Sequence, residues 1–279
     1  MMTAFWSELS SFLALDFVKR ALIVGALVSL CAALLGVSLV LKRYAMIGDG
    51  LSHVGFAVLA IAAGLGVTEW QLYISIPVMI LAAFLLLRLN ENSGVKGDAA
   101  IGVIATLALA IGYIVTYRAG TNVDLANFMF GNIFTIRHAD AVGSIIVAVA
   151  VLLLFVLFYH KLFAVTFDET FARASGVPVG WYNTLLAVLI AVTIVLGMRM
   201  MGTLLISALI VFPALSAMRL CRSFRGVVIT AAAFSLFCFF TGAVTAHLLN
   251  FPAGSTVVAV NGILFGICSV ISLFRRRVK

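Results

Sequence analysis

Nine long runs of apolar residues dominate this chain of 279 residues and limit what it can fold into. They cover residues 21–41, 45–66, 71–88, 99–117, 141–163, 181–197, 200–220, 226–250 and 255–274. A helix needs about 20 predominantly apolar residues to cross a hydrocarbon core of roughly 30 Å. Only 10% of the residues are charged, against about 25% in a typical soluble protein. We therefore expect an all-α, polytopic transmembrane protein with eight or nine spans, since the two runs that meet at Arg199 could include a broken or re-entrant piece.

The connections between the runs carry the basic residues that predict orientation. If the loop over residues 166–180 and the C-terminus are cytoplasmic, thirteen Lys and Arg face inward and five face outward. The N-terminus is then outside and the C-terminus inside a plasma membrane. These basic residues have no interleaved aromatic platform, so the net charge of +8 does not predict a nucleic-acid partner. Residues 1–20 alternate apolar and polar positions and predict an interfacial amphipathic segment before a transmembrane domain over residues 21–279.

A carboxylate and an imidazole interrupt the second apolar run. Asp49 and His53 are four residues apart, so on a helix they share one face. An ionisable residue at membrane depth is costly and by default predicts a functional site. Counting about 1.5 Å per residue from Arg43 places His53 roughly 15 Å deep, near the bilayer centre. The alternative is that Asp49 caps the helix and that a carbonyl group accepts a hydrogen bond from His53.

The loop over residues 166–180 is long enough to form a helix. From composition alone, this could be an ordinary amphipathic helix between two spans, with Asp168 as its N-cap. Residues 118–140 predict a surface or re-entrant segment, whose Asp124, His138 and Asp140 either collect cations at the outer mouth or form a solvated face. His247, toward the outer side of the eighth run, could line the mouth of a pathway or could be a satisfied histidine.

The sequence lacks motifs for other kinds of chemistry. No nucleotide-binding loop of the Gly-x-x-x-x-Gly-Lys-Ser/Thr type occurs, so a transporter driven by ATP would need a separate ATPase. A secondary transporter or channel for a divalent cation remains an alternative, although no clear internal repeat is visible. An intramembrane enzyme would need a nucleophile motif or a fuller set of metal ligands, and neither H-E-x-x-H nor G-x-S-x-G is present.

Four stretches resemble the integral membrane permeases of bacterial zinc/manganese ABC importers. They are MIGDGLSH at 46–53, DAAIG at 98–102, FDETFARASGVP at 167–178 continued by GTLLISALIVFPA at 202–214, and FPAGSTVV at 251–258. The stretches occur in the family's order with sensible spacing. Gly50 departs from the pattern, since Ala is usual at that position. Residues 1–20 match nothing in the family.

The resemblance implies a permease subunit without catalytic activity, in the inner membrane of a bacterium. Its substrate would be Zn²⁺ or Mn²⁺, with no cofactor permanently bound, and Asp49 and His53 would contact the metal. One chain supplies too few ligands, so a two-fold homodimer would combine two such pairs. The partners implied are this second copy, a dimer of cytoplasmic ATPases, an extracytoplasmic metal-binding protein and membrane lipid. The residues implied in ATPase coupling are Phe167, Asp168, Glu169, Phe171, Ala172, Gly176, Val177 and Pro178. Oxygen and nitrogen ligands accept zinc, manganese and iron alike, so the metal itself is not predicted.

Overall fold

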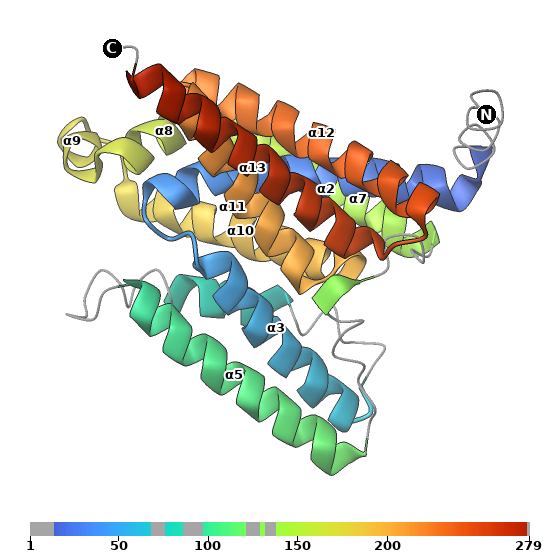
Figure 1. Ribbon diagram of the computed structural model, residues 1–279. Helices are drawn as coiled ribbons and strands as arrows, with labels where there is room; N and C mark the ends of the chain where they lie inside the picture. The colour runs from blue at the N-terminus through green and yellow to red at the C-terminus, as the bar shows by residue number, and fades with distance from the viewer. Residues whose placement is uncertain (1–13, 68–75, 86–96, 121–128, 132–137, 278–279) are drawn as a thin grey trace, which may run out of the picture.

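Helices make up nearly all of the described chain. The computed structural model describes residues 14–67, 76–85, 97–120, 129–131 and 138–277 (Figure 1). Eight of the helices in these ranges are long and apolar enough to cross a membrane. They are α2 (Asp16–Leu41), α3 (Ile47–Gly64), α5 (Gly97–Ala119), α7 (His138–Leu157), α10 (Val179–Met201), α11 (Thr203–Leu220), α12 (Phe224–Leu249) and α13 (Ala253–Arg277). The prediction of an all-α polytopic membrane protein is confirmed.

Three shorter helices complete the described chain. Ile76–Leu85 lies in the third apolar run, whose flanks fall outside the described residues. The helices α8 (Tyr159–Phe167) and α9 (Glu169–Ala174) follow α7 and lead to α10. At the other end of the chain, α2 begins at Asp16, and residues 1–13 lie outside the described part. The proposed interfacial segment therefore stays a prediction.

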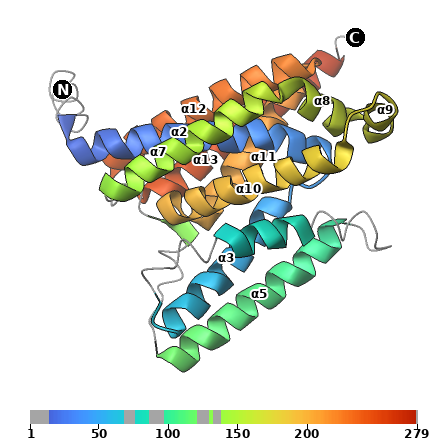
Figure 2. The same ribbon diagram turned by 180° about the vertical axis from the view of Figure 1, so that it is seen from behind.

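The helix α2 occupies the centre of the larger group of helices. In its most apolar stretch 72% of the residues are buried, against 22% in α13, and it packs against α7, α10, α11 and α12. The helices α3 and α5 lie side by side and extend away from this group in both views (Figures 1 and 2). The start of α3 stays in contact with α10 and α11. This contact joins the segment that contains Asp49 to the central helices.

The sequence predicted a break between the sixth and seventh apolar runs at Arg199. In the structure, the break between α10 and α11 occurs at Gly202 instead. Gly202 has φ 91° and ψ 159°, a conformation that is accessible essentially only to glycine, while Met198 and Arg199 remain inside α10. A Cβ atom at residue 202 would lie 2.6 Å from the backbone of Met129, Phe130 and Gly131. The described residues 129–131 thus pack on this junction, and glycine is required at residue 202 for both the dihedral angles and the space.

Candidate functional site

The pair of Asp49 and His53 lies in the first two turns of α3. Their side chains are adjacent, with 3.6 Å between Asp49 Oδ2 and His53 Nε2. The N-cap of α3 is Met46, so the alternative in which Asp49 caps the helix is wrong. The chain turns at Arg43, with φ 63°, before α3 begins at Ile47, so the ten residues from Arg43 to His53 do not form one continuous helix, and the depth of His53 in the bilayer stays a prediction. Six residues of helix place His53 roughly 9 Å from that start.

Small residues fix the neighbouring faces of α3. Gly48 and Ser52 face α11, where the Ser52 hydroxyl lies 3.3 Å from that of Ser207 and a Cβ at Gly48 would lie 3.1 Å from Ile210 Cδ1. On another side, a Cβ at Gly50 would lie 2.5 Å from Ile101 of α5. At about 100° per residue, Asp49 and His53 fall on the strip between these two contacts. The packing of α3 therefore sets the direction of both side chains.

The distance between the two donor atoms fits shared coordination of one cation. Two ligand atoms on a tetrahedral ion lie ~3.4 Å apart when the bonds are about 2.1 Å long. A carboxylate oxygen and a neutral imidazole nitrogen suit divalent transition metals. Among the residues that the structure describes, no group of three or more His, Cys, Asp and Glu could hold a metal ion. The Asp49 side chain is 50% exposed and that of His53 26%, so the described part of one chain offers two accessible ligands here, fewer than a tetrahedral cation requires.

Of the other polar residues considered for metal contact, the two whose side chains the structure describes, Asp140 and His247, do not join this pair. Asp140, at the start of α7, pairs with Arg199 of α10 at 3.2 Å. This pairing also gives Arg199 a specific partner. His247 lies in the last turn of α12. Asp124 and the side chain of His138 lie outside the described residues.

The segment predicted to couple to an ATPase contains the end of α8, at Phe167, and the helix α9. Asp168 is its N-cap, with the carboxylate accepting a hydrogen bond from Phe171 N at 2.9 Å. Phe167 and Phe171 are 70% and 68% exposed. Two residues of the predicted coupling set, Ala172 and Val177, are buried within the chain. Val177 is a predicted docking residue, but its side chain presents little surface to a partner. Gly176 and Pro178 are exposed beside them.

A polar cluster of Lys42, Glu169 and Asn183 lies next to α9 and could not be predicted from the sequence. Lys42 Nζ lies 2.6 Å from Glu169 Oε1 and 2.7 Å from Asn183 Oδ1. Asn183 Nδ2 donates a third hydrogen bond, to the same Glu169 oxygen, at 3.2 Å. In the sequence, Lys42 is one of the basic residues that predict orientation, and nothing near it predicts a partner. No local pattern could reveal this pairing, because 127 positions separate Lys42 from Glu169.

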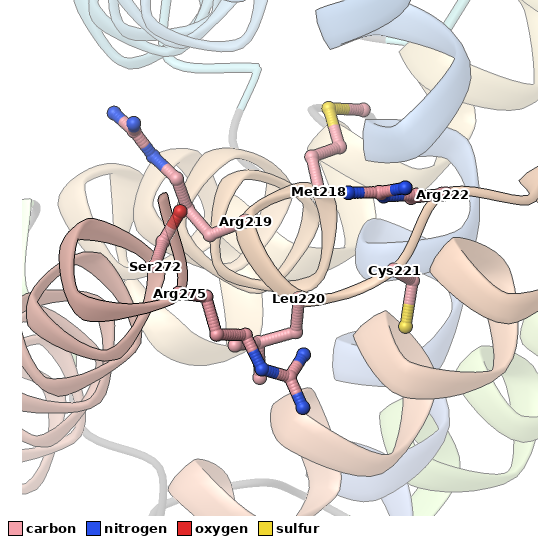
Figure 3. A pocket seen from close by; sticks show the side chains of 7 residues that line it. All are labelled: Met218, Arg219, Leu220, Cys221, Arg222, Ser272 and Arg275. Carbon is pink, nitrogen blue, oxygen red and sulfur yellow. The ribbon is translucent and has the colours of Figure 1, made fainter. Parts of the chain in front are cut away.

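A hollow of about 360 Å³ lies near the C-terminal ends of α11 and α13. It is lined by Met218, Arg219, Leu220, Cys221, Arg222, Ser272 and Arg275. Figure 3 shows the guanidinium groups of Arg219 and Arg275 pointing to opposite sides. The positive charge of the three arginines opposes the binding of a metal cation in this hollow.

Comparison with known proteins identifies the family. The model of the ABC 3 transport family matches residues 14–272. The manganese import system permease protein ScaB of Streptococcus parasanguinis is 30% identical over 280 residues, which cover 100% of this chain and 98% of that protein. The high-affinity zinc uptake system membrane protein ZnuB of Haemophilus influenzae is 31% identical and covers 92% of this chain and 96% of its own length.

A solved structure has the same fold. PsaBC from Streptococcus pneumoniae in complex with Fab superposes with a TM-score of 0.81 at 30% sequence identity, covering 96% of this chain and 95% of that one. The family match spans nearly all of the described helices, including α3, α9 and the α10–α11 junction. This chain is a membrane-spanning member of the ABC 3 transport family.

Proposed function

We propose that this chain is the transmembrane subunit of an ATP-driven importer that carries Mn²⁺ or Zn²⁺ into the cytoplasm of a bacterium. The pair of Asp49 and His53 carries the proposal, because it combines the two donor types that these cations accept at a separation of 3.6 Å. Similar proteins are named as manganese and zinc permeases. The cation is cargo and no cofactor is permanently bound.

The working unit is a homodimer in this proposal. Each copy contributes one Asp49 and one His53, and a two-fold axis beside α3 would bring four donors together, the number that a tetrahedral cation requires. The partial exposure of both side chains in one chain supports this arrangement. The affinity of the site must stay modest, since a site on a transport path has to release what it binds.

The ATPase docks on α9 at the cytoplasmic side. The exposed rings of Phe167 and Phe171 support docking, since two large apolar side chains on one short connection are suited to a groove on a partner protein. The bias of Lys and Arg supports an orientation with α9 and the C-terminus on the cytoplasmic side of the plasma membrane and the N-terminus on the outer side. A metal-binding protein delivers the cation from outside, and ATPase closure then opens the site inward.

The test is uptake of radioactive Mn²⁺ and Zn²⁺ into proteoliposomes that contain the permease, its ATPase and the metal-binding protein. Wild type is compared with Asp49→Ala and His53→Ala, and Asp16→Ala serves as the matched carboxylate control because that side chain is 90% exposed. We expect uptake to fall at least about tenfold in the two site variants, with ATP hydrolysis retained, and to stay unchanged in the control.

Each outcome has a defined meaning once insertion and assembly of the variants have been verified. Normal uptake in both site variants would refute the metal site. Uptake by wild type without ATP or without the ATPase would refute the importer and favour a secondary transporter or channel. The ratio of Mn²⁺ to Zn²⁺ uptake then identifies the preferred cargo.

A further inference from the structure

Three side chains from three separate elements meet at the end of α2. Lys42 is the C-cap residue of α2, Glu169 is the first residue of α9, and Asn183 lies in the second turn of α10. Each of the three hydrogen-bonds the other two, at 2.6, 2.7 and 3.2 Å. We call this triangle the Lys42 cluster. Because it is closed, none of the three elements can move relative to the others without losing at least two of these bonds.

Burial makes the Lys42 cluster stiff. The side chain of Lys42 is only 8% exposed, whereas lysine is almost never buried unless it is paired. Burial raises the pKa of Glu169, but the hydrogen bonds from Lys42 and Asn183 and the charges of Lys42 and Arg173 together leave the pKa of that carboxyl below its ordinary value. Glu169 is therefore ionised at neutral pH. Opening the contact leaves the shielded Lys42 ammonium group without this partner, whereas water can reach Glu169, whose side chain is 40% exposed, so the cost of opening falls mainly on Lys42.

The connection from Lys42 to Asp49 is short and is itself hydrogen-bonded. Tyr44 N donates to Leu39 O at 2.9 Å, and Ile47 N donates to Tyr44 O at 3.0 Å. The second bond leads directly into α3, which begins at Ile47. Such a turn transmits a displacement of Lys42 to the start of α3, and Asp49 is in the first turn of that helix.

On its other side the Lys42 cluster reaches the surface that faces the ATPase. Glu169 directly follows the N-cap Asp168, which holds the backbone of Phe171. The Phe171 ring is exposed two residues beyond Glu169. A push on Phe171 therefore moves Glu169, and with it Lys42.

We propose that the Lys42 cluster is the mechanical link through which movement of α9 repositions α3 and opens or closes the metal site. This inference rests on the proposed function above. Lys42 and Glu169 are then positioning residues, which touch neither the cation nor ATP. The expected defect is uncoupling: the ATPase runs, but each ATP hydrolysed carries fewer cations.

The experiment measures Mn²⁺ and Zn²⁺ uptake and ATP hydrolysis in the same proteoliposomes and reports their ratio. We expect Lys42→Met and Glu169→Gln to lower the ratio about tenfold, within the range of typical coupling energies, while the complex assembles and hydrolyses ATP. Lys42→Arg should keep most of the coupling, and the exchange of charges in Lys42→Glu/Glu169→Lys should restore part of it. The control is Lys19→Met, on the same helix, whose pair with Asp16 is exposed and 3.5 Å long.

The possible outcomes separate the two proposals. Wild-type uptake with an unchanged ratio in both Lys42→Met and Glu169→Gln refutes the link and leaves the importer intact. A proportional fall of assembly, hydrolysis and uptake, without rescue by the charge exchange, also refutes it, because a purely structural pair behaves in that way. Absence of ATP-dependent uptake by wild type refutes the proposed function and this inference with it.

Discussion

A close approach between the central helices α2 and α11, at Gly36, allows a sharp test of the packing. At Gly36, an added Cβ atom would lie 2.0 Å from the backbone oxygen of Ile210 and 2.9 Å from its carbonyl carbon. That oxygen belongs to α11 and cannot rotate away. The substitution Gly36→Ala must therefore push the two helices apart. Overpacking of a tight interior costs about 1–3 kcal/mol, and the rigid backbone contact favours the upper end. Alanine favours the helical backbone over glycine by about 1 kcal/mol, so the free energy of unfolding should fall by about 2 kcal/mol in total.

Two matched substitutions isolate the cause. Gly55→Ala meets the thioether of Met198 at 2.6 Å, and this unbranched side chain can shift, so we expect a loss below about 1 kcal/mol. Gly143→Ala, exposed on α7, meets nothing within 4 Å and should be neutral or stabilising by up to about 1 kcal/mol. Equilibrium unfolding in detergent micelles, followed by tryptophan fluorescence, measures all three. An unfolding midpoint for Gly36→Ala equal to that of Gly143→Ala would refute the reasoning.

Three further predictions concern α9 and the end of α12. Phe171→Ala should weaken binding of the ATPase by at least about 1 kcal/mol. The unfolding midpoint should not fall, because the ring is exposed in the free chain. Light-scattering titration measures the affinity, and unchanged binding would contradict the docking surface. Glu169 faces Lys42 and Arg173, and its pKa in the folded protein is lowered. Ionised Glu169 therefore makes its full contribution to stability above the ordinary glutamate pKa of about 4.3. This contribution disappears as the pH falls through the lower pKa of the folded protein. Wild type should therefore exceed Glu169→Gln in stability at pH 6, with a smaller difference at pH 3.5; a constant difference would contradict this. Asn250 ends α12 in the left-handed region with φ 53°, so Asn250→Ala should cost about 1 kcal/mol and Asn250→Gly should be tolerated, and equal losses would show that the backbone angle does not matter.

Local pattern predicted the spans because the bilayer requires each one to be apolar over its own length. Eight of the nine apolar runs match a described spanning helix. The remaining one, the third run over residues 71–88, contains the shorter helix Ile76–Leu85. The boundaries were less accurate. The break before α11 lies at Gly202, since only glycine accepts φ 91°, and the preceding Arg199 is held in α10 beside Asp140. Hydropathy does not register either effect.

The candidate site divides in the same way. The spacing of Asp49 and His53 predicted a shared face, and the side chains lie 3.6 Å apart, because a four-residue step on a helix is fixed geometry. The capping segment at Asp168 also followed from its neighbours in sequence. The direction in which the Asp49–His53 pair points was not predictable, since it depends on Gly48 and Ser52 packing against α11.

By itself, then, the sequence determined the class of protein, the succession of spans and the pairing of residues within one or two helical turns. These properties depend on the contact of each segment with lipid and on the periodicity of the helix. Only the tertiary structure decided that Lys42 meets Glu169 and Asn183, that Val177 is buried beside exposed Phe171, and that glycine is needed at the crossing of α2 and α11. These contacts join positions far apart in the chain, and their energy depends on distances that arise only when the helices pack.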